Sequence, residues 1–408
     1  MSNGQLLSIN TYHYPKGGSE MVYFAHAALM ERHGWTNSFY AMHHKENLPC
    51  VDSRYFAEHI SFGASAPLRE KAAAAARIIY SREARAKLAR LIDTRRIDVA
   101  HVHNIYHHLS PSVLVELKRR GIPLVMTVHD LKLACPAYTM RNGSGVCERC
   151  KGGRVWNVAI HRCIKGSAAL SGLIMVESAI HKALRIYARH IDRIVTPSAF
   201  YREKLIEWGW PPDKLVHIRN FVPDAPPPAA TPGGDHVLYF GRLTPEKGIA
   251  TLIKAAAASS IPVRIAGTGP QEAELRALAK SLGAPAIFAG FLKGDALWAE
   301  VDAARAVVLP SEWYENSPMS VVEAFQRGKP LVGARIGGIP ELIEEGRTGW
   351  SFRAGDVADL ARALAVARET PDTQLASMSA ACQELVSRNY SEHAYFEAMS
   401  ALYKKLLV

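Results

Sequence analysis

The chain has 408 residues, of which 48% are apolar and 21% are charged. That length exceeds what one hydrophobic core usually holds and predicts two domains of about 200 residues each. No apolar run reaches the ~18–20 residues of a membrane span, and the N-terminus lacks the pattern of a signal peptide, so a cytoplasmic protein is expected.

The net charge of +11 is distributed unevenly along the chain. Residues 1–220 carry 31 Lys and Arg against 17 Asp and Glu, whereas residues 221–408 carry 18 against 21. Positive charge confined to one half predicts an anionic partner for that half, such as a membrane surface, a lipid pyrophosphate or a nucleic acid. A solvated basic surface without a ligand is the alternative.

Short apolar runs alternate with helical patterns through the first half. The expected strands are residues 6–10, 99–104, 123–130, 194–198 and 214–220, and the clearest helical patterns are 21–34 and 111–120. This alternation predicts a parallel sheet with helices on both faces. Residues 221–235 are rich in Pro and Gly, which predicts a loop close to a domain boundary.

The second half repeats the same rhythm. Strands are expected at residues 236–241, 262–266, 286–292, 306–311 and 330–335, and helices at 249–259 and 272–283. Residues 390–408 form an amphipathic pattern that is expected to pack back on the first domain. The sequence therefore predicts an α/β protein with an N-terminal domain of residues 1–220 and 390–408, and a C-terminal domain of residues 221–389. Ligands of such sheets bind at the carboxyl ends of the strands.

The segment Glu315-Asn-Ser-Pro-Met-Ser-Val-Val-Glu323 follows an expected strand and opens an expected helix. The free N–H groups and the dipole of a helix N-terminus form an anion site, so Ser317, Met319 and Ser320 can offer amides to a diphosphate. Glu323, about one turn into the helix, can accept both hydroxyls of a ribose. Ordinary N-terminal capping by acidic residues is the alternative.

The loop Gly241-Arg-Leu-Thr-Pro-Glu-Lys-Gly248 also follows an expected strand. Arg242 can clamp two oxygens with its planar guanidinium, and Lys247 adds a compact positive charge. Together they suit a leaving diphosphate, whose negative charge grows as the sugar bond breaks. A solvated surface loop is the alternative.

Three more segments lie at expected strand ends. The Gly17-Gly18 pair and the turn Ala266-Gly-Thr-Gly-Pro270 let the backbone approach a ligand closely. His129 can hydrogen-bond a sugar hydroxyl or, as a structural residue, main-chain groups. His101 and His103 alternate to one face and are interpreted as packing or acceptor-side residues rather than metal ligands.

In combination these motifs resemble the retaining GT-B glycosyltransferases of family 4, of the type with a Cys-rich insertion in the N-terminal domain, here residues 131–176. The resemblance covers nearly the whole chain and rests on GRLTPEKG, AGTGP, ENSPMSVVE, KGGSE, TVHD and VTPS. The chain departs from the family at Ile218-Arg-Asn-Phe221, where IPNG is usual. The resemblance implies two Rossmann-like domains facing across a cleft, with the acceptor held by the N-terminal domain and a nucleotide sugar by the other.

The resemblance also implies a role for individual residues. It implies His129, Arg242, Lys247 and Glu315 as catalytic side chains. It implies that the donor is held by Gly17, Gly18, Arg242, Lys247, Gly267, Gly269, Ser317, Pro318, Met319, Ser320 and Glu323. No Asp-x-Asp occurs in the sequence, so catalysis without a metal or another cofactor is expected. No residue stands out as a covalent nucleophile, which favours retention by front-face attack.

Four cysteines cluster in the insertion as Cys135-x11-Cys147-x2-Cys150-x12-Cys163. One CxxC with two flanking cysteines can make a tetrahedral thiolate site, so structural zinc is predicted there. The alternative is a set of reduced, partly buried cysteines.

The predicted function is transfer of a hexose from a UDP- or GDP-linked donor to a lipid-linked or polysaccharide acceptor. The setting would be cell-surface glycan synthesis, such as that of lipopolysaccharide, with peripheral contact to the cytoplasmic face of the membrane. A sugar-nucleotide epimerase or phosphorylase of the same fold is one alternative. A nucleic-acid-binding protein that uses the basic half is another, although no aromatic stacking platform or reader motif is present, and no nucleic acid is expected as a partner.

Overall fold

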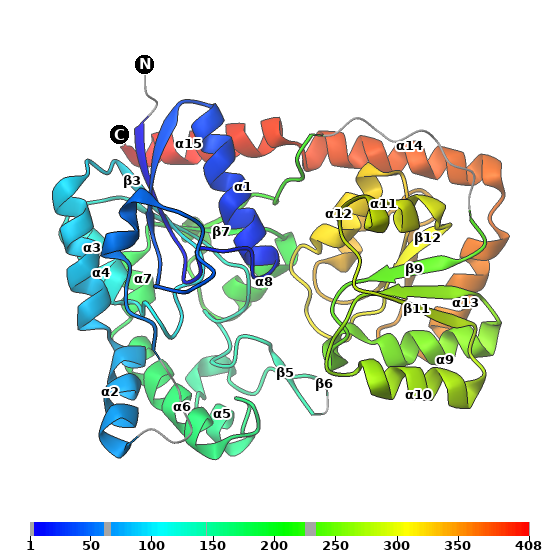
Figure 1. Cartoon of the computed structure of the whole chain (residues 1–408), viewed down its shortest axis with the longest axis horizontal. Coiled ribbons are helices and arrows are strands. Elements are labelled where there is room, and N and C mark those ends of the chain that lie inside the picture. Colours follow the sequence, from blue (N-terminus) through cyan, green and yellow to red (C-terminus); the bar gives the residue numbers. More distant parts are fainter. Residues whose placement is uncertain (1–3, 61–66, 144, 225–233, 408) are drawn as a thin grey trace. The chain divides into compact units, whose positions relative to one another are not determined.

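A computed structural model describes residues 4–60, 67–143, 145–224 and 234–407. The chain divides into two compact units (Figure 1). The first comprises Met1–Asn142, Cys147–Ile218 and Tyr395–Val408, and the second comprises Gly143–Val146 and Arg219–Ala394. Of the loop predicted at residues 221–235, residues 225–233 lie outside the described part of the chain.

The first unit is built on a six-stranded sheet in the order β2-β1-β3-β4-β7-β8. All its neighbouring strands are parallel. The central strands β1, β3 and β4 are almost entirely buried, as expected when helices cover both faces of a sheet. The strands are β1 (Gly4–Ile9), β2 (Trp35–Tyr40), β3 (Val99–Val102), β4 (Leu124–Thr127), β7 (Arg193–Thr196) and β8 (Leu215–His217).

Helices connect these strands, and the C-terminal helix returns to the same unit (Figure 1). On that helix, Tyr395 and Tyr403 form hydrogen bonds of 3.0 Å each with the two ring nitrogens of the buried His26. The Cys-rich segment of residues 131–176 contains the short strands β5 (Arg141–Asn142), in the first unit, and β6 (Gly145–Val146), which belongs to the second. The helices of the unit are α1 (Gly18–Arg32), α2 (Leu68–Ile79), α3 (Arg82–Thr94), α4 (Ser112–Arg119), α5 (Asn157–Ile160), α6 (Ala168–Ala183), α7 (Ile186–His190), α8 (Ala199–Glu207) and, largely, α15 (Glu392–Leu407).

The second unit has a parallel sheet in the order β11-β10-β9-β12-β13-β14. Numbered within the unit this is 3-2-1-4-5-6, the doubly wound order of dinucleotide-binding domains. Its strands are β9 (Val237–Phe240), β10 (Val263–Ala266), β11 (Ala286–Gly290), β12 (Ala306–Leu309), β13 (Leu331–Ala334) and β14 (Gly349–Phe352). Its helices are α9 (Ile249–Ser259), α10 (Glu272–Leu282), α11 (Gly294–Ala303), α12 (Met319–Gln326), α13 (Val357–Glu369) and α14 (Asp372–Asn389). The prediction of two doubly wound parallel-sheet domains is therefore confirmed.

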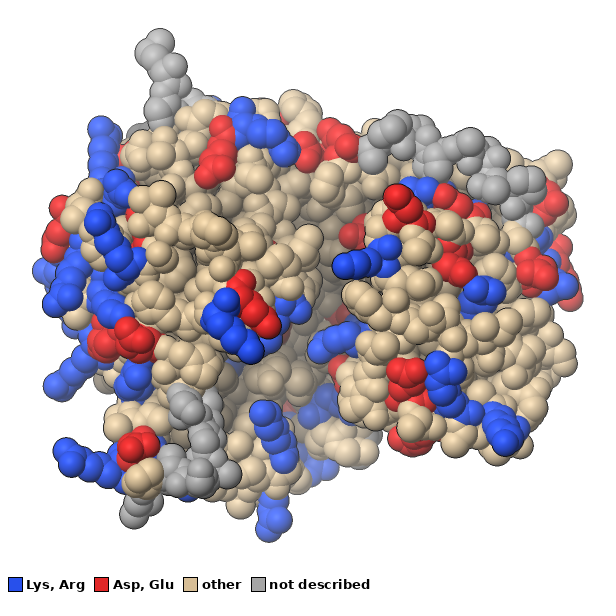
Figure 2. Space-filling model, in the orientation of Figure 1, with Lys and Arg blue, Asp and Glu red and all other residues tan. Residues whose placement is uncertain are grey.

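The charge asymmetry of the sequence is visible on the surface. Lys and Arg predominate on the visible face of the first unit, whereas both signs of charge alternate over the second (Figure 2). None of the helices in the described part of the chain combines the length and the apolar character needed to cross a membrane.

Candidate functional site

The second unit places two predicted motifs at the point where its strand order reverses. That reversal lies between β9 and β12, which are neighbours in the sheet but three strands apart in sequence. The loop after β9 carries Arg242 and Lys247, and the loop after β12 carries Glu315. Because ligands of open α/β sheets bind outside the carboxyl ends of strands at such a reversal, these two loops form the candidate site.

The two loops are packed directly on each other. The amide of Glu312 donates to the carbonyl of Glu246 at 2.8 Å, and the Thr251 hydroxyl donates to the Glu312 carboxylate at 2.6 Å. Gly248 has a φ of +67°, and a Cβ there would lie 1.9 Å from the Pro310 carbonyl oxygen. Only glycine allows this approach, so the glycine that ends GRLTPEKG fixes one loop against the other.

This packing brings Lys247, which is partly exposed, and the buried Glu315 into an ion pair. The Lys247 ammonium lies 2.6 Å from Glu315 Oε1, and the Ser311 hydroxyl donates to the same oxygen at 2.6 Å. Burial alone would raise the pKa of Glu315, but the charge of Lys247 and these hydrogen bonds outweigh burial and lower the pKa. The carboxylate is therefore ionised at neutral pH, and it holds the lysine at the strand ends.

Two charged side chains of the same motifs have no protein partner in the described part of the chain. Arg242 is exposed, and its guanidinium makes neither an ion pair nor a hydrogen bond there. The carboxylate of Glu323 likewise has no partner, and its burial raises its pKa to about 7. A cation and a mostly buried carboxylate that are both left unpaired are groups that a ligand with phosphates and hydroxyls could satisfy.

Between the two glutamates, α12 begins at Met319 with Pro318 as its N-terminal cap residue. No side chain caps this end of the helix, which leaves amides of Met319 and Ser320 available, and their contact with a diphosphate stays a prediction. Ser317 lies in the loop just before it. The Gly337-Gly338 turn fixes the position of Glu315 from the other side, because the amide of Gly338 donates to the Glu315 carbonyl at 2.8 Å.

Gly267 and Gly269 have a structural reason to be glycines. A Cβ on Gly267 would lie 1.9 Å from the carbonyl oxygen of Gly241, and a Cβ on Gly269 would lie 2.3 Å from that of Leu243. The turn thus packs backbone against backbone on the loop that carries Arg242. Its expected contact with the donor stays a prediction.

Replacement of Gly267 by alanine is expected to lower the free energy of unfolding by about 3 kcal/mol or more, because strain at its φ of +146° adds to the backbone clash. Gly283 is a matched control, since it has a φ of +58° but a Cβ added there would have no atom within 4 Å. Gly283→Ala should cost only about 1 kcal/mol. Urea unfolding of both variants measures the difference, and equal losses would contradict the packing argument.

The Gly17-Gly18 pair lies in the first unit, where Gly17 precedes α1 in an extended conformation. A Cβ on Gly18 would have no atom within 4 Å, and a Cβ on Gly17 would touch only the Glu20 carboxylate at 3.5 Å. Neither the backbone nor the packing therefore requires glycine there. Contact with the donor remains the prediction for both residues.

His129 belongs to a column of stacked histidines in the first unit. Its Nε2 lies 2.8 Å from Nδ1 of His103, whose ring stacks in turn on His101. Burial lowers the pKa of His129 to about 4, and it lowers that of the other two well below the usual value. All three are neutral at pH 7, and His101 and His103 are fully buried. Only His129 retains some exposure, so it is the member of the column that a ligand could contact.

The four cysteines of the insertion line one small cavity, together with His161. All four carry free thiols, and burial raises the pKa of Cys135, Cys150 and Cys163. Within the described residues, however, no group of three or more His, Cys, Asp or Glu side chains is arranged to hold a metal ion. Structural zinc therefore stays a prediction, and neutral thiols are what this arrangement favours.

Sequence reasoning missed three residues of the site in the second unit. Ser311 shares the carboxylate oxygen with Lys247, and Gly337 lies against the backbone of Glu315. Tyr239 donates its hydroxyl to the Arg242 carbonyl at 2.8 Å and so shapes the turn that presents this arginine. Ser311 could have been noticed, because it is the first polar side chain after a buried strand. The other two depend on tertiary packing alone.

Two family models match the chain. Residues 27–220 match the glycosyl transferase 4-like domain, and residues 227–382 match glycosyl transferases group 1. The chain is 28% identical over 323 residues to the sulfoquinovosyl transferase SQD2 of Arabidopsis thaliana, covering 72% of this chain and 58% of that protein. It is 32% identical over 277 residues to a glycogen synthase of Mycobacterium tuberculosis, covering 65% of each. The chain thus spans less than two thirds of the length of these curated relatives.

Solved structures agree on the fold. Anabaena HepE, crystallised with UDP and glucose, superposes with a TM-score of 0.67 at 17% identity and covers 98% of this chain and 100% of its own. Sucrose-phosphate synthase from Thermosynechococcus elongatus gives a TM-score of 0.71 at 18% identity, with 99% of both chains covered. The two doubly wound units are those of the GT-B architecture, and the chain consists largely of a glycosyl transferase 4-like domain followed by a group 1 glycosyltransferase domain.

Proposed function

We propose that the chain is a retaining hexosyltransferase that takes a sugar from a nucleoside diphosphate and transfers it to an acceptor held by the first unit. The observation that supports this best is the loop pair at the strand reversal of the second unit. It pairs Lys247 with Glu315 and leaves Arg242 and Glu323 without partners among the described residues. The names of the curated relatives describe sugar transfer, and HepE was crystallised with UDP and glucose, the ligand class proposed here.

Each group has a role in this proposal. Arg242 and Lys247 bind the diphosphate and stabilise the charge that develops as it leaves, assisted by the amides at the start of α12. Glu323 accepts hydrogen bonds from the ribose hydroxyls, and Glu315 with the loop that follows it holds the donor sugar. His129, a neutral hydrogen-bonding group, lines the reaction centre. The positive charges replace a metal ion, so EDTA should leave the turnover unchanged.

Retention would follow from attack on the same face that the diphosphate leaves. In that step the acceptor hydroxyl forms the new bond to the anomeric carbon, the diphosphate departs with the electron pair of the old bond, and the hydroxyl proton passes to a departing phosphate oxygen. The anomeric configuration of the product, read by NMR, decides between retention and inversion.

The acceptor is proposed to be a lipid-linked or polysaccharide glycan. The excess positive charge of residues 1–220 supports an anionic acceptor or an anionic membrane surface beside it. Cell-surface glycans appear in the names of one relative and one solved structure, a putative colanic acid biosynthesis glycosyltransferase and a lipopolysaccharide outer core galactosyltransferase.

A thermal-shift panel with UDP, GDP, ADP and CMP tests the donor site and its base. A ligand at about 100 times its Kd stabilises the protein by about 2.7 kcal/mol, which is readily measured. Because a carboxylate holds two hydroxyls better than a carboxylic acid does, and because burial raises the pKa of Glu323 to about 7, the affinity for the preferred diphosphate should rise from pH 6 to pH 8.

Glu323→Gln is the control. It should bind the same diphosphate more weakly at pH 8, and the part of the increase in affinity from pH 6 to pH 8 that ionisation of Glu323 causes should be absent. A carboxyl group whose pKa is raised by folding stabilises the protein only at low pH, and that contribution is lost as the pH rises through 7. The ligand-free Gln variant should accordingly be more stable than the native protein at pH 8. No shift with any nucleotide, at either pH, would count against the proposed function.

A further inference from the structure

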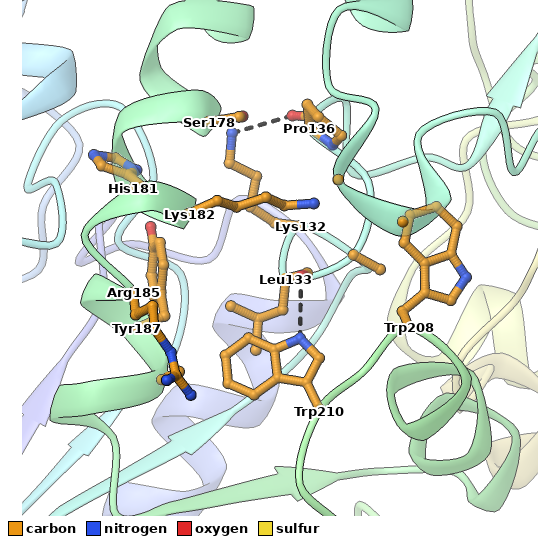
Figure 3. A pocket seen from close by; sticks show the side chains of 14 residues that line it. Lys132, Leu133, Pro136, Ser178, His181, Lys182, Arg185, Tyr187, Trp208 and Trp210 are labelled. Atoms are coloured by element: carbon orange, nitrogen blue, oxygen red, sulfur yellow. Dashed lines mark hydrogen bonds between the residues drawn. The ribbon is translucent and has the colours of Figure 1, made fainter.

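The first unit contains a pocket that none of the predicted site residues lines. Its volume is about 310 Å³, and four stretches of the chain form it: the start of the Cys-rich segment just after β4, Gly152 and Gly153 later in that segment, the junction of α6 and α7, and the tryptophans that follow α8 (Figure 3). A cavity of about 300 Å³ is at the lower end of small-ligand sites and is large enough for one sugar ring.

Hydrogen bonds hold the walls of the pocket in place. Trp210 donates its indole N–H to the Leu133 carbonyl at 3.1 Å, and the Lys132 ammonium donates to the Pro136 carbonyl at 3.1 Å (Figure 3). His181, also on the wall, bonds to the Ile79 carbonyl at 2.7 Å. Because these contacts tie the loop after β4, α6 and the segment after α8 in place, the pocket exists before any ligand binds and little ordering has to accompany binding.

The pocket carries positive charge that the protein does not neutralise. The Lys132 ammonium is paired with the buried Glu177 carboxylate at 2.8 Å, and the other oxygen of that carboxylate lies 3.6 Å from Nδ1 of His181. Glu207, next to Trp208 in the chain, is engaged by two other lysines. Lys182 and Arg185, in contrast, form no ion pair or hydrogen bond through their side chains among the described residues.

The two cations lie on either side of the break between α6 and α7. Arg185 has a φ of +51°, which is uncommon for a residue with a side chain, and it is the N-terminal cap residue of α7, two residues after α6 ends. In Figure 3 the Lys182 side chain extends across the pocket toward the space between Pro136 and Trp208. Lys182, in the last turn of α6, and Arg185, at the start of α7, thus line the same cavity.

The two tryptophans give the pocket apolar surface beside its positive charge. Trp208 and Trp210 are both partly exposed and line the pocket from the same short segment. Indole rings offer large apolar faces at little entropic cost, and the C–H faces of a sugar ring pack well on them. An unneutralised lysine and arginine beside such faces suit a carboxylate or phosphate attached to the ring.

We infer that this pocket binds a sugar ring that carries an anionic group, either a carboxylate or a phosphate ester, as one unit of the acceptor. That the bound sugar is part of the acceptor rests on the proposed function, whereas binding of an anionic sugar by this pocket does not. It also gives the Cys-rich insertion a role, because Gly152 and Gly153 of that insertion form part of the wall.

Titration with simple sugars, followed by tryptophan fluorescence, tests the inference without any donor. Glucuronic acid and glucose 6-phosphate are the two anionic probes. Glucose represents the sugar ring without a charge, and inorganic phosphate represents the anionic group without a ring. We expect a Kd of about 1 mM for at least one anionic sugar. Binding at least tenfold weaker is expected for glucose and for phosphate. Comparison of the two anionic probes shows whether the pocket takes a carboxylate or a phosphate.

The double variant Lys182→Gln/Arg185→Gln should weaken binding of that probe at least tenfold. Lys165→Gln/Arg189→Gln is matched to it, because it removes one lysine and one arginine that are exposed and do not line the pocket. Equal affinities in the two double variants, phosphate binding as tightly as glucose 6-phosphate, or no binding of either anionic sugar would each overturn the inference. The nucleotide panel is independent of this pocket, so the donor proposal and the inference can fail separately.

Discussion

Replacement of Lys247 by methionine is expected to lower the free energy of unfolding by about 3 kcal/mol and kcat/KM at least ~100-fold. The stability falls because Glu315 stays buried without its counter-charge, while the Ser311 hydroxyl remains as a partner. The activity falls because the diphosphate loses a positive charge as it leaves. Urea unfolding measures the first effect, and steady-state kinetics with the donor identified by the nucleotide panel measure the second.

Two further variants separate these effects. Lys247→Met/Glu315→Gln removes the stranded charge, so it should regain at least half of the lost stability but none of the lost activity. Lys254→Met changes an exposed lysine of α9 that has no ion pair among the described residues, and it should change neither quantity. A single variant that loses activity at full stability would show that the pair does not support the fold.

The pH dependence of this loss has a definite sign. In the native protein the pKa of Glu315 is lowered. Its contribution to the free energy of unfolding is therefore present above the ordinary carboxyl pKa and is lost as the pH falls. In Lys247→Met, burial acts without the lysine and raises that pKa. The difference in stability between the two proteins should therefore grow as the pH rises from 5 to 7.

The sheets were predictable because most of their strands are buried on both faces and therefore read as uninterrupted apolar runs. Of the strands in the two six-stranded sheets, the sequence analysis missed β2 and β14, which lie at sheet edges, but it predicted the other two edge strands, β8 and β11. In β2, the run Trp-Thr-Asn-Ser-Phe-Tyr mixes polar and apolar residues, because one side of an edge strand is less covered. A run of apolar residues, rather than the place of a strand in its sheet, thus decides which strands a single sequence reveals.

The candidate site was predictable as a set of residues but not as a geometry. Glycine-flanked loops after apolar runs indicated where a phosphate could bind. That Lys247 pairs with Glu315, however, depends on contact between loops 68 residues apart. That contact is possible because Gly248 and Gly337 have no side chains, and in the sequence each of them is only one glycine among 29. The pocket of the first unit was hidden for the same reason, since its walls come from four segments.

Arg242→Met is expected to weaken binding of the preferred nucleoside diphosphate about 10- to 100-fold, with a change in stability within about 0.5 kcal/mol. Arg242 is exposed and has no partner in the described part of the chain, so the fold loses nothing when the guanidinium is removed. The ligand loses charge-assisted hydrogen bonds to its phosphates. Isothermal titration measures the affinity and thermal unfolding the stability. Arg388→Met changes an exposed arginine of α14 that is likewise unpaired among the described residues, and this control should change neither.

The same variant can show which part of the nucleotide Arg242 contacts. If the guanidinium binds the terminal phosphate, affinity for the diphosphate should fall toward that for the corresponding monophosphate, while affinity for the monophosphate itself should change little. Glu323→Gln should instead weaken binding of the diphosphate and of the monophosphate equally, because both nucleotides carry the ribose. Equal losses for both nucleotides in Arg242→Met would instead mean that the arginine binds the inner phosphate, and Lys247 would then be the residue closest to the leaving oxygen.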